Sequence, residues 1–556
     1  MESLPPSLLQ VLHRRGHKTL AQIDRILAPS LDLSSFSVTD MDKAVLRLRL
    51  AIRREEPIAL YADRDVDGLS GLAILVRSLR TLGADTFWGS PLEGRGLERP
   101  VLETLAQTGA KVMILVDCGT GETTEIKWLA SLGIDVIVAD HHRMLAERPP
   151  AFAWIHPQAC ASPPAPLPLG EGGPDAKRRG TGEAETPCGA VMAFRLAEGL
   201  WRSFIGPSDP ERLQYFLFAH LDLVALGILA DRVPLTGENR ALVWHGLRRL
   251  AKTRKEGLAS LLRFFRIKGE VVTVRQATWQ IIPLLNAAGR LGKPHWATDL
   301  LITEDPVTAR ACIDALLGLN TERRKAQTAS VDHFEKTVLE QCQVDKDPVL
   351  IVAARDLPAG QAGLEPSVTG LAAQSLVQKY GRPAFLFVEQ GEDLVGSGRG
   401  TPDVDLFGWI ERHQDLLVKF GGHQGAVGMT VRKSDFPALR EGLFKSAQER
   451  APGFAPGPVE PEAEIELREA GPEWWENLQR LEPFGQGFEI PAFELRGVDE
   501  VAVRSKRSPT KVMLKQGAIA WPGEFLNSTG RPQRIIATPQ ATPKDDFPFK
   551  WMIHEG

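Results

Sequence analysis

The sequence predicts an α/β protein built around a doubly wound parallel sheet. Short apolar strands are expected at 58–62, 112–117 and 135–140, and they alternate with helices at 69–83 and 122–133 that each end at a glycine. Strands that alternate with helices are joined by right-handed crossovers and therefore run parallel.

A second alternation of strands and helices predicts a smaller α/β domain later in the chain. It runs from "PVLIVAARD" through "RPAFLFVEQ" to "AVGMTVRKSDF". The C-terminal region, with "VAVRSKRSPTKVMLKQGAIAWPG" and "RIIATPQ", shows short strand and turn patterns that are compatible with a small β-barrel.

With 556 residues, the chain is too long for one ordinary core and should divide into several domains. Residues 159–187 are rich in Pro, Gly and charge, and they are predicted to form a disordered surface insertion. The predicted domains, in order, are an N-terminal helical lead at 1–50, the first α/β domain at 51–245, a helical connector at 246–340, the second α/β domain at 341–450 and the β-rich domain at 451–556.

The composition is that of a soluble globular protein, with 43% hydrophobic residues, 24% charged residues and a net charge of -4. No overall basic excess is present, so binding to nucleic acid would depend on local clusters of Lys and Arg. The five cysteines are widely spaced and form no CxxC pair, which favours a reducing, cytoplasmic location. The apolar run "YFLFAHLDLVALGILA" is interrupted by His220 and Asp222, so we expect a buried helix and no membrane association.

Acidic side chains follow three consecutive predicted strands. Asp63, Asp65 and Asp67 follow the first strand, Asp117 ends the second, and "DHH", residues 140–142, follows the third. Ligands of parallel sheets bind at the carboxyl ends of the strands, so these groups should gather at one edge. Crowded carboxylates repel each other unless a cation neutralises them. Carboxylates mixed with imidazole and lacking thiolate favour Mn²⁺ or another borderline hard divalent metal over structural zinc.

Each motif alone also has a structural interpretation. "DRDVDG" is compatible with a calcium-type loop or a polar turn, two adjacent histidines with a surface loop, and Asp117 with a helix cap. Their coincidence at three successive strand ends favours a catalytic metal site.

The motifs resemble those of a known superfamily. "DRDVDG", "LVDCGTG" and "ADHH" resemble the first three motifs of the DHH phosphoesterases, and "LDLVALGILADRVPLTGENR" resembles the fourth. "TPCGAVMAFRLAEGL", "LLNAAGRLGKPHWATDLLIT", "GSGRG", "KFGGHQGAVGMTV" and "LEPFGQGFEIPAF" extend the resemblance to the RecJ family, bacterial exonucleases specific for single-stranded DNA, over nearly the whole chain.

This resemblance implies a site with two divalent metal ions, Mn²⁺ being favoured and Mg²⁺ the alternative. The implied metal ligands are Asp65, Asp67, Asp117, His141 and Asp231, with Asp117 as the bridging ligand. The implied catalytic residues are Asp63, which would ligate or support the metals, His142, which would orient or protonate the phosphate, and Asp140, which would fix a histidine through its ring nitrogen.

The second α/β domain resembles the DHHA1 domain, which the resemblance places across a cleft from the metals. Its glycine-rich stretches offer substrate ligands, although glycine-rich turns also occur for purely structural reasons. The C-terminal domain resembles an OB fold, in which Trp521 would either stack on bases or belong to the core. The implied substrate-binding residues are Ser397, Arg399, Gly421, Gly422 and His423 in the DHHA1-like domain, with Asn286 and Arg290 lining the nucleic-acid path.

Two positions depart from the family pattern. Arg64 replaces the usual aromatic residue between the first two aspartates and would add positive charge beside the metals, and Glu365 in "LEPSVTGLAA" replaces a histidine.

The resulting expectation is a metal-dependent exonuclease that removes nucleotides from single-stranded DNA, from the 5′ end, in recombination and repair. Single-strand-binding protein or a helicase is an expected partner, and a monomer the expected state. The alternatives are a DHH phosphodiesterase for short oligonucleotides or cyclic dinucleotides, and a non-catalytic nucleic-acid or replisome scaffold. The scaffold predicts lost ligands, whereas all the expected aspartates and both histidines are present.

Overall fold

The structure is a computed structural model of the chain. Residues 158–186, which include nearly all of the predicted insertion, and Glu365 lie outside the described residues. The structure describes residues 4–31, 38–92, 96–142, 148–157, 187–205, 208–344, 346–354, 366–401, 404–449, 459–505, 510–525, 535–542 and 547–555. The chain forms two compact units, of which the larger comprises Phe36–Asp231 and Arg248–Ala455.

The first sheet of the larger unit is fully parallel, as the sequence predicts, with the strand order β2-β1-β3-β4-β5. From β1, the chain first adds β2 on one side and then β3 on the other, so the topological switch point lies between β1 and β3. Ligands of such sheets bind at the carboxyl ends of the strands at this point. The sequence patterns identified β1, β3 and β4 but not the two short edge strands, β2 and β5. The strand bounds are Ile58–Ala62 for β1, Thr86–Gly89 for β2, Val112–Val116 for β3, Asp135–Ala139 for β4 and Ala153–Ile155 for β5.

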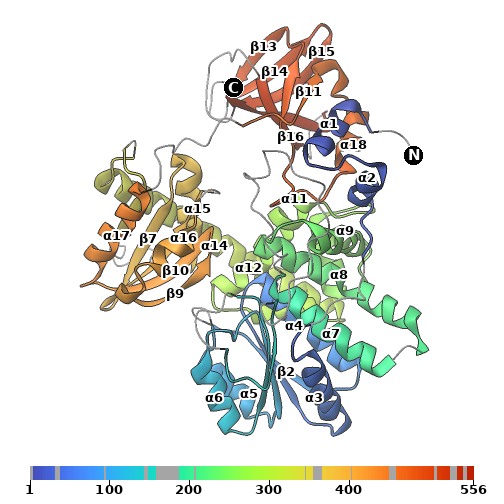
Figure 1. The fold of residues 1–556 in the computed structure, drawn as a ribbon, viewed down its shortest axis with the longest axis vertical. Coiled ribbons are helices and arrows are strands. Elements are labelled where there is room, and N and C mark those ends of the chain that lie inside the picture. The colour runs from blue at the N-terminus through green and yellow to red at the C-terminus, as the bar shows by residue number, and fades with distance from the viewer. Residues whose placement is uncertain are drawn as a thin grey trace. The chain divides into compact units, whose positions relative to one another are not determined.

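Helices cover both faces of this sheet (Figure 1). Alternate strand residues, such as Tyr61 and Leu115, form a buried cluster with α5 and α6, because side chains of a strand alternate between the two faces. The other face packs against α4, where Val116 lies beside Gly71, and α4 in turn packs against α7 and α8. These helices are α3 (Met41–Arg53), α4 (Val66–Thr81), α5 (Arg99–Ala106), α6 (Thr123–Ser131), α7 (Gly189–Ile205) and α8 (Pro210–Asp231).

A helical region joins the two sheets of the larger unit. Its last helix, α14, contacts α10, α12 and α13 near its start, and α15 and β6 near its end. The bounds are α10 (Glu256–Phe265), α11 (Val274–Gln276), the π-helical turn η4 (Ala277–Ile281), α12 (Ile282–Arg290), α13 (His295–Ile302) and α14 (Pro306–Gln341). The preceding helix, α9 (Gly237–Ala251), belongs to the smaller unit up to Leu247.

The second sheet confirms the smaller α/β domain, with the strand order β6-β7-β8-β10-β9. Only the β6 and β7 pair is parallel among its described pairings; the others are antiparallel. The bounds are β6 (Leu350–Ala354), α15 (Pro366–Tyr380), β7 (Ala384–Gln390), β8 (Asp393–Arg399), α16 (Leu406–Glu411), η5 (Gln414–Leu416), β9 (Leu417–His423), β10 (Ala426–Arg432) and α17 (Phe436–Gln448).

The smaller unit combines Met1–Ser35, Arg232–Leu247 and Pro456–Gly556. Its described strands form a mixed seven-stranded sheet of order β11-β12-β16-β17-β15-β14-β13. The bounds are α1 (Pro6–Arg14), α2 (Leu20–Leu27), β11 (Ala463–Glu466), η6 (Leu467–Glu469), α18 (Pro472–Gln479), β12 (Phe493–Arg496), β13 (Glu500–Ser505), β14 (Thr510–Gln516), β15 (Ile519–Phe525), β16 (Ile535–Ala541) and β17 (Phe549–Glu555).

The predicted N-terminal lead is divided between the two units. The indole Nε1 of Trp474 donates to Ser7 Oγ at 3.0 Å, and Arg15 pairs with Glu462 at 2.6 Å, so α1 packs with the C-terminal sheet. Helix α3, by contrast, packs against α7 and β5 of the larger unit. These contacts join residues far apart in the sequence, which local patterns do not reveal.

Trp521 belongs to the core of the smaller unit. It is 7% exposed and stacks on Phe549 at a centroid distance of 4.6 Å. Of the two roles that the sequence allowed, the structural one is therefore correct, and a base-stacking role for this residue is not.

Helix α8 is long and apolar enough to cross a membrane by length and composition alone, but 72% of its most apolar stretch is buried inside the protein. Asp222, the charged residue in the middle of this helix, is fully buried and accepts hydrogen bonds from Lys255 Nζ at 2.8 Å and from Thr253 Oγ1 at 2.7 Å. This network fixes α8 against the start of α10, and α8 ends at Asp231.

We expect Asp222→Ala to lower the thermal midpoint sharply, because it leaves the Lys255 ammonium buried without a counter-charge, at a cost of about 3–5 kcal/mol. Differential scanning calorimetry measures this. Glu211→Ala, on the exposed start of the same helix, is the matched control. Equal midpoints for the two variants would contradict the assigned role of the network.

Candidate metal centre

The loop after β1 is ordered by its own aspartates. Asp65 is the N-cap of α4, and its Oδ1 accepts from the backbone N–H groups of Asp67 at 3.0 Å and Gly68 at 3.3 Å. Such caps satisfy N–H groups that lack a partner inside the helix. The cap begins α4 directly after the sheet edge, so Asp63, Asp65 and Asp67 stay at the carboxyl end of β1.

The strands β3 and β4 bring their acids to the same edge. Asp117 follows β3 with φ of 58°, a left-handed conformation that Asp tolerates better than most residues. His141 follows β4, and its Nε2 lies 3.2 Å from Asp117 Oδ1, 3.9 Å from Asp67 Oδ2 and 3.8 Å from Asp231 Oδ2. One imidazole nitrogen therefore faces carboxylates from three different elements.

These residues form overlapping groups in which potential ligand atoms lie within 4.8 Å of one another. The groups are Asp63, Asp65 and Asp117; Asp67, His141 and Asp231; and Asp117, Asp140, His141 and His142. The structure thus brings together all five predicted metal ligands and the three predicted catalytic residues. Asp117 and His141 each belong to two of the groups.

The chemistry of the cluster fits divalent cations. Asp117 is 3% exposed, and its Oδ1 accepts no hydrogen bond from the described part of the chain. A buried carboxylate oxygen without a donor is costly unless a charge compensates it. Carboxylates and imidazole are suitable ligands for Mn²⁺ and Mg²⁺, so the residues that would hold the metals are present.

The pKa values in the cluster reflect burial and crowding. Burial, followed by the charges of Asp67 and Asp65, raises the pKa of Asp117 well above its usual range. Burial also raises the pKa of Asp231 to about 7. For His141, burial lowers the pKa, but the carboxylates of Asp231 and Asp67 raise it by more. A bound cation would relieve the same repulsion that raises the pKa of the acids.

Asp140 positions His142. Its Oδ1 lies 2.8 Å from His142 Nδ1 and also accepts the backbone N–H of His141 at 2.8 Å, while Oδ2 accepts from Thr120 N at 3.1 Å. Partial burial lowers the pKa of His142, but Asp140 raises it by more, to about 9. Because Nδ1 is held by Asp140, Nε2 is the nitrogen that remains to meet a ligand.

Sequence reasoning assigned no role to the start of α7, which holds Asp67 in place. The carboxylate of Asp67 accepts from the backbone N–H groups of Gly189 at 2.7 Å and Ala190 at 2.9 Å. A Cβ at Gly189 would lie 2.5 Å from Asp117 Cβ, so only glycine allows this approach. The sequence signal for this contact is the run of small residues in "TPCGAVMAF", whose side chains have no charged group that would indicate a functional site.

Two residues near the cluster have clear contacts. The side-chain oxygen of Asn286 accepts from Val66 N at 2.9 Å, so Asn286 supports the metal loop itself. Arg64, which was expected to alter the charge beside the metals, donates to the backbone oxygen of Leu92 at 3.3 Å. Arg290, the other residue predicted to line the path, ends α12, which also carries Asn286.

The second sheet aligns the predicted residues of the DHHA1-like domain. Gly428 pairs with Ser397 on one side and with Gly421 on the other, and Ala426 likewise pairs with Arg399 and His423. The two rows are two residues apart along β10, so they lie on the same face of the sheet. Gly422 lies between the rows in sequence and therefore belongs to the opposite face.

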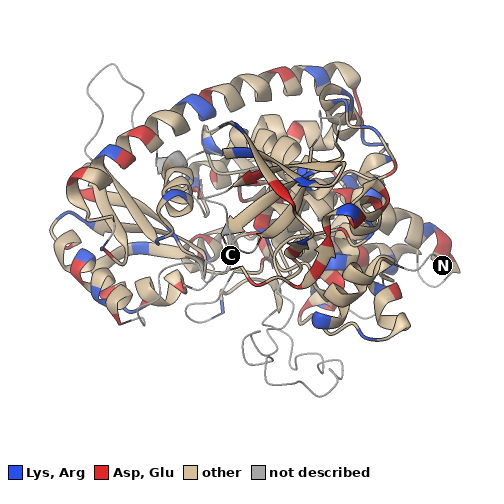
Figure 2. Ribbon diagram, turned by 90° about the horizontal axis from the view of Figure 1, so that it is seen from above, with Lys and Arg blue, Asp and Glu red and all other residues tan. Residues whose placement is uncertain are grey.

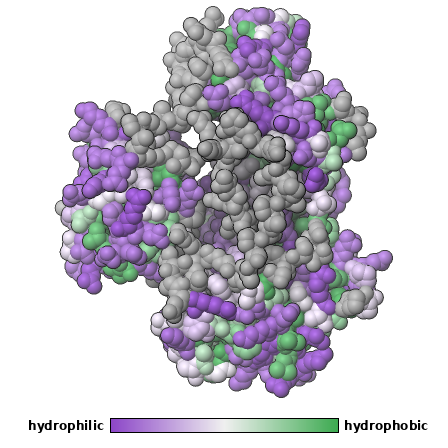
Figure 3. Space-filling model, viewed as in Figure 1, coloured by the Kyte–Doolittle hydropathy of each residue, from purple (hydrophilic) through white to green (hydrophobic). Residues whose placement is uncertain are grey.

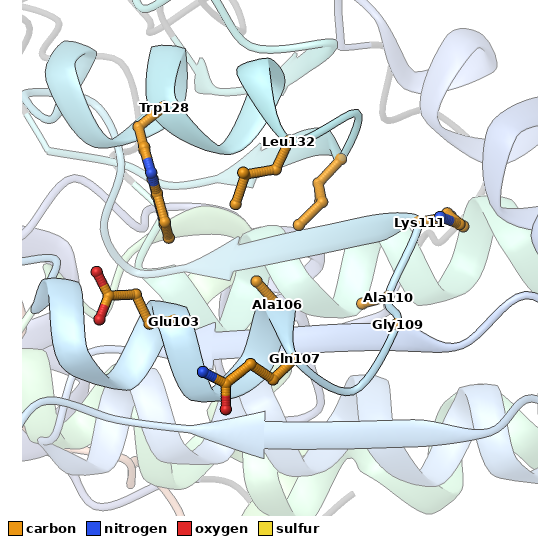
Figure 4. A pocket seen from close by; sticks show the side chains of 9 residues that line it. Glu103, Ala106, Gln107, Gly109, Ala110, Lys111, Trp128 and Leu132 are labelled. Carbon is orange, nitrogen blue, oxygen red and sulfur yellow. The ribbon is translucent and has the colours of Figure 1, made fainter.

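A pocket of about 350 Å³ lies elsewhere in the first domain (Figure 4). Trp128 of α6 and Leu132, which follows this helix, face Gln107 across it, and Lys111 and Ile134 border it just before β3 and β4. It is therefore at the amino ends of these strands, opposite the acid cluster, and contributes nothing to the metal centre.

Comparisons with known proteins agree with this geometry. The model of the DHH family, N-terminal domain, matches residues 57–228, and the model of the DHHA1 domain matches residues 347–449. The parallel sheet and its cluster of acids and histidines thus define a member of the DHH phosphoesterases.

Full-length relatives narrow the assignment. The single-stranded-DNA-specific exonuclease RecJ of Thermus thermophilus is 32% identical over 511 residues, which cover 91% of this chain and 67% of the relative. RecJ of Bacillus subtilis is 31% identical over 456 residues, 80% of this chain and 52% of the relative, so the chain spans about half the length of that protein. The chain belongs to the RecJ family.

Solved structures extend the similarity to three dimensions. A crystal structure of RecJ in complex with Mn²⁺ from Thermus thermophilus matches with a TM-score of 0.76 and 25% identity, covering 99% of this chain and 78% of that one. A structure of exonuclease RecJ bound to manganese matches with a TM-score of 0.57 and 29% identity, covering 76% of this chain and 98% of that one.

Substituting Gly189 should disrupt the metal centre. The added Cβ of Gly189→Ala would displace Asp117, so we expect Mn²⁺ affinity to fall at least about tenfold, the effect of roughly 1.4 kcal/mol. Isothermal titration calorimetry with Mn²⁺ measures this. Gly318→Ala in α14, where a Cβ meets open space, is the control. An affinity equal to that of the control would show that Gly189 does not constrain Asp117.

Charge crowding should make stability depend on metal. In EDTA, Asp117→Asn should melt at a higher temperature than the wild type, because the substitution removes one repelling charge. Mn²⁺ at a hundred times Kd should stabilise the wild type by about 2.7 kcal/mol but should not stabilise Asp117→Asn. Thermal melts with and without Mn²⁺ test this. Asp332→Asn, on the exposed face of α14, should behave as the wild type. The prediction fails if Asp117→Asn gains as much from Mn²⁺ as the control does.

Proposed function

We propose that the protein is a metal-dependent exonuclease that hydrolyses phosphodiester bonds of single-stranded DNA, in the 5′ to 3′ direction, in recombination and repair. The observation that carries the proposal is the complete set of carboxylates and histidines at the carboxyl edge of the first sheet. The similarity to relatives named as single-stranded-DNA-specific exonucleases supports the substrate.

The proposed centre holds two divalent ions, with Mn²⁺ preferred and Mg²⁺ as the alternative. Asp65, Asp67, Asp117, His141 and Asp231 would hold them, supported by the overlapping groups around Asp117 and by the metal-bound structures of relatives. Such ions, when bound, neutralise the phosphate and activate water for in-line displacement.

The remaining side chains of the site have separate roles in this proposal. Asp140 holds the His142 ring by Nδ1, and His142 orients or protonates the phosphate through Nε2. Asp63 supports the metals from the end of β1. In the second domain, Ser397, Arg399, Gly421, Gly422 and His423 are the proposed ligands of the phosphate backbone, and Arg290 would line the path of the strand. The shared face of Ser397, Arg399, Gly421 and His423 supports this for those four, whereas Gly422 belongs to the opposite face.

The expected surroundings follow from the proposed reaction. A single-strand-binding protein or a helicase would supply the strand, and the enzyme would act as a cytoplasmic monomer. In the view of Figure 2, Lys and Arg are intermixed with Asp and Glu along the described ribbon, and hydrophilic residues are intermixed with hydrophobic ones among the described residues visible in Figure 3. DNA binding would therefore depend on local cationic segments.

We expect the wild type with Mn²⁺ or Mg²⁺ to shorten single strands from the 5′ end and to leave blunt duplexes intact. Asp117→Asn should reduce the rate by about a thousandfold, because it removes roughly 4 kcal/mol of charge stabilisation. The assay uses 5′-labelled and 3′-labelled strands, labelled duplexes and dinucleotides. Asp332→Asn again serves as the control.

Several results would overturn the proposal. Preferential degradation of duplex ends, or undiminished activity of Asp117→Asn, would exclude this mechanism. Hydrolysis of dinucleotides without binding of longer strands would identify a small-substrate phosphodiesterase, and strand binding without any hydrolysis would identify a scaffold.

A further inference from the structure

An exposed tryptophan, Trp279, lies in the turn that directly precedes α12, the helix that contacts the metal loop. Trp279 is 75% exposed and is the only tryptophan among the strongly exposed large hydrophobic residues of the described chain. It belongs to η4, a single π-helical turn between α11 and α12. Such turns are often found at functional sites. None of the roles in the proposed exonuclease reaction belongs to this side chain.

Trp279 is part of an accessible stripe that leads to the metal loop. Pro283, Asn286 and Arg290 continue the stripe along α12, whereas the residues between them are buried against the core. The end of α12 touches the loop directly, because Asn286 accepts from Val66 N and a Cβ at Gly289 would lie 2.1 Å from the Arg64 backbone oxygen. The position of Trp279 relative to the metal loop is therefore fixed by a continuous helix.

The distance along this helix corresponds to a few nucleotides. Seven residues separate Trp279 from Asn286 in the sequence, and a helix rises 1.5 Å per residue, which gives roughly 10 Å. Stacked nucleotides of one strand rise about 3.4 Å each, so the interval fits up to about three nucleotides.

The charge of the segment matches nucleic acid. Residues 271–298 contain Arg275, Arg290 and Lys293 and no Asp or Glu. A cationic segment that presents an aromatic face is the arrangement that binds single strands, since every base can stack on an aromatic ring.

We propose that Trp279 is a stacking platform for a base of the substrate strand, about three nucleotides along α12 from Asn286, which contacts the metal loop. The inference rests on the proposed exonuclease function and assigns it a binding subsite. Stacking is tolerant of sequence, so Trp279 contributes affinity for single strands without base preference. A paired base has both faces occupied by its neighbours in the duplex, so this subsite also favours unpaired DNA.

The test separates binding from hydrolysis. In the Asp117→Asn background, binding of single-stranded oligonucleotides is measured by fluorescence anisotropy, with an abasic site placed at each of the terminal positions in turn. We expect one position at which the abasic site weakens binding by about tenfold, within the range reported for stacking on one residue. Adding Trp279→Ala should weaken binding of the intact strand by the same factor. In this variant, an abasic site at that position should cause no further loss of affinity. Trp279→Phe should restore most of the affinity for the intact strand and most of the effect of the abasic site.

Tyr215→Ala is the matched control, because Tyr215 is 62% exposed on α8 and has no role in the site. In the otherwise wild-type enzyme, Trp279→Ala should raise KM for long strands about tenfold with kcat nearly unchanged, and leave dinucleotide cleavage unaffected. If the abasic-site profile is unchanged by Trp279→Ala, or if affinity falls equally for Tyr215→Ala, the subsite does not exist. Absence of hydrolysis by the wild type would refute the exonuclease function, while the abasic-site profile would still decide the role of Trp279.

Discussion

The mutual repulsion of buried carboxylates is the constraint on which the centre depends. Asp63, Asp67 and Asp117 are each at most 6% exposed, and together with Asp65 and Asp231 they meet at one sheet edge. His141 faces Asp67, Asp117 and Asp231, and backbone N–H groups bind the carboxylates of Asp65 and Asp67, so the fold itself holds the acids close together. A divalent ion converts this repulsion into attraction, which couples the stability of the site to its chemistry.

The protein holds these acids through close backbone approaches. The first N–H groups of α7 bind Asp67, the start of α4 is capped by Asp65, and Asn286 holds the same turn from α12. Helix N-termini favour negative charge, so α7 stabilises the carboxylate that it positions. Gly189 allows α7 to approach Asp117, and the buried Asp222 network fixes α8, which ends at Asp231. The predicted metal ligands are thus held in place by contacts from neighbouring helices.

The proposed path of the strand uses the same elements. Helix α12 supports the metal loop with Asn286 and, through the continuous turn that precedes it, carries Trp279. A displacement of this helix would therefore change strand binding and metal geometry together. This coupling suits the proposed exonuclease, which would align each successive phosphate with the same site.

The sequence by itself determined the parallel sheet and the meeting of Asp65, Asp117 and His141, because the carboxyl ends of parallel strands share one edge and the motifs follow those ends directly. Only the tertiary structure decided which distant groups support them. The contact of Gly189 with Asp117, the packing of α1 on the C-terminal sheet and the burial of Trp521 join segments far apart in the chain. Small or apolar residues of this kind fit many environments, so their neighbours are set by packing and not by local pattern.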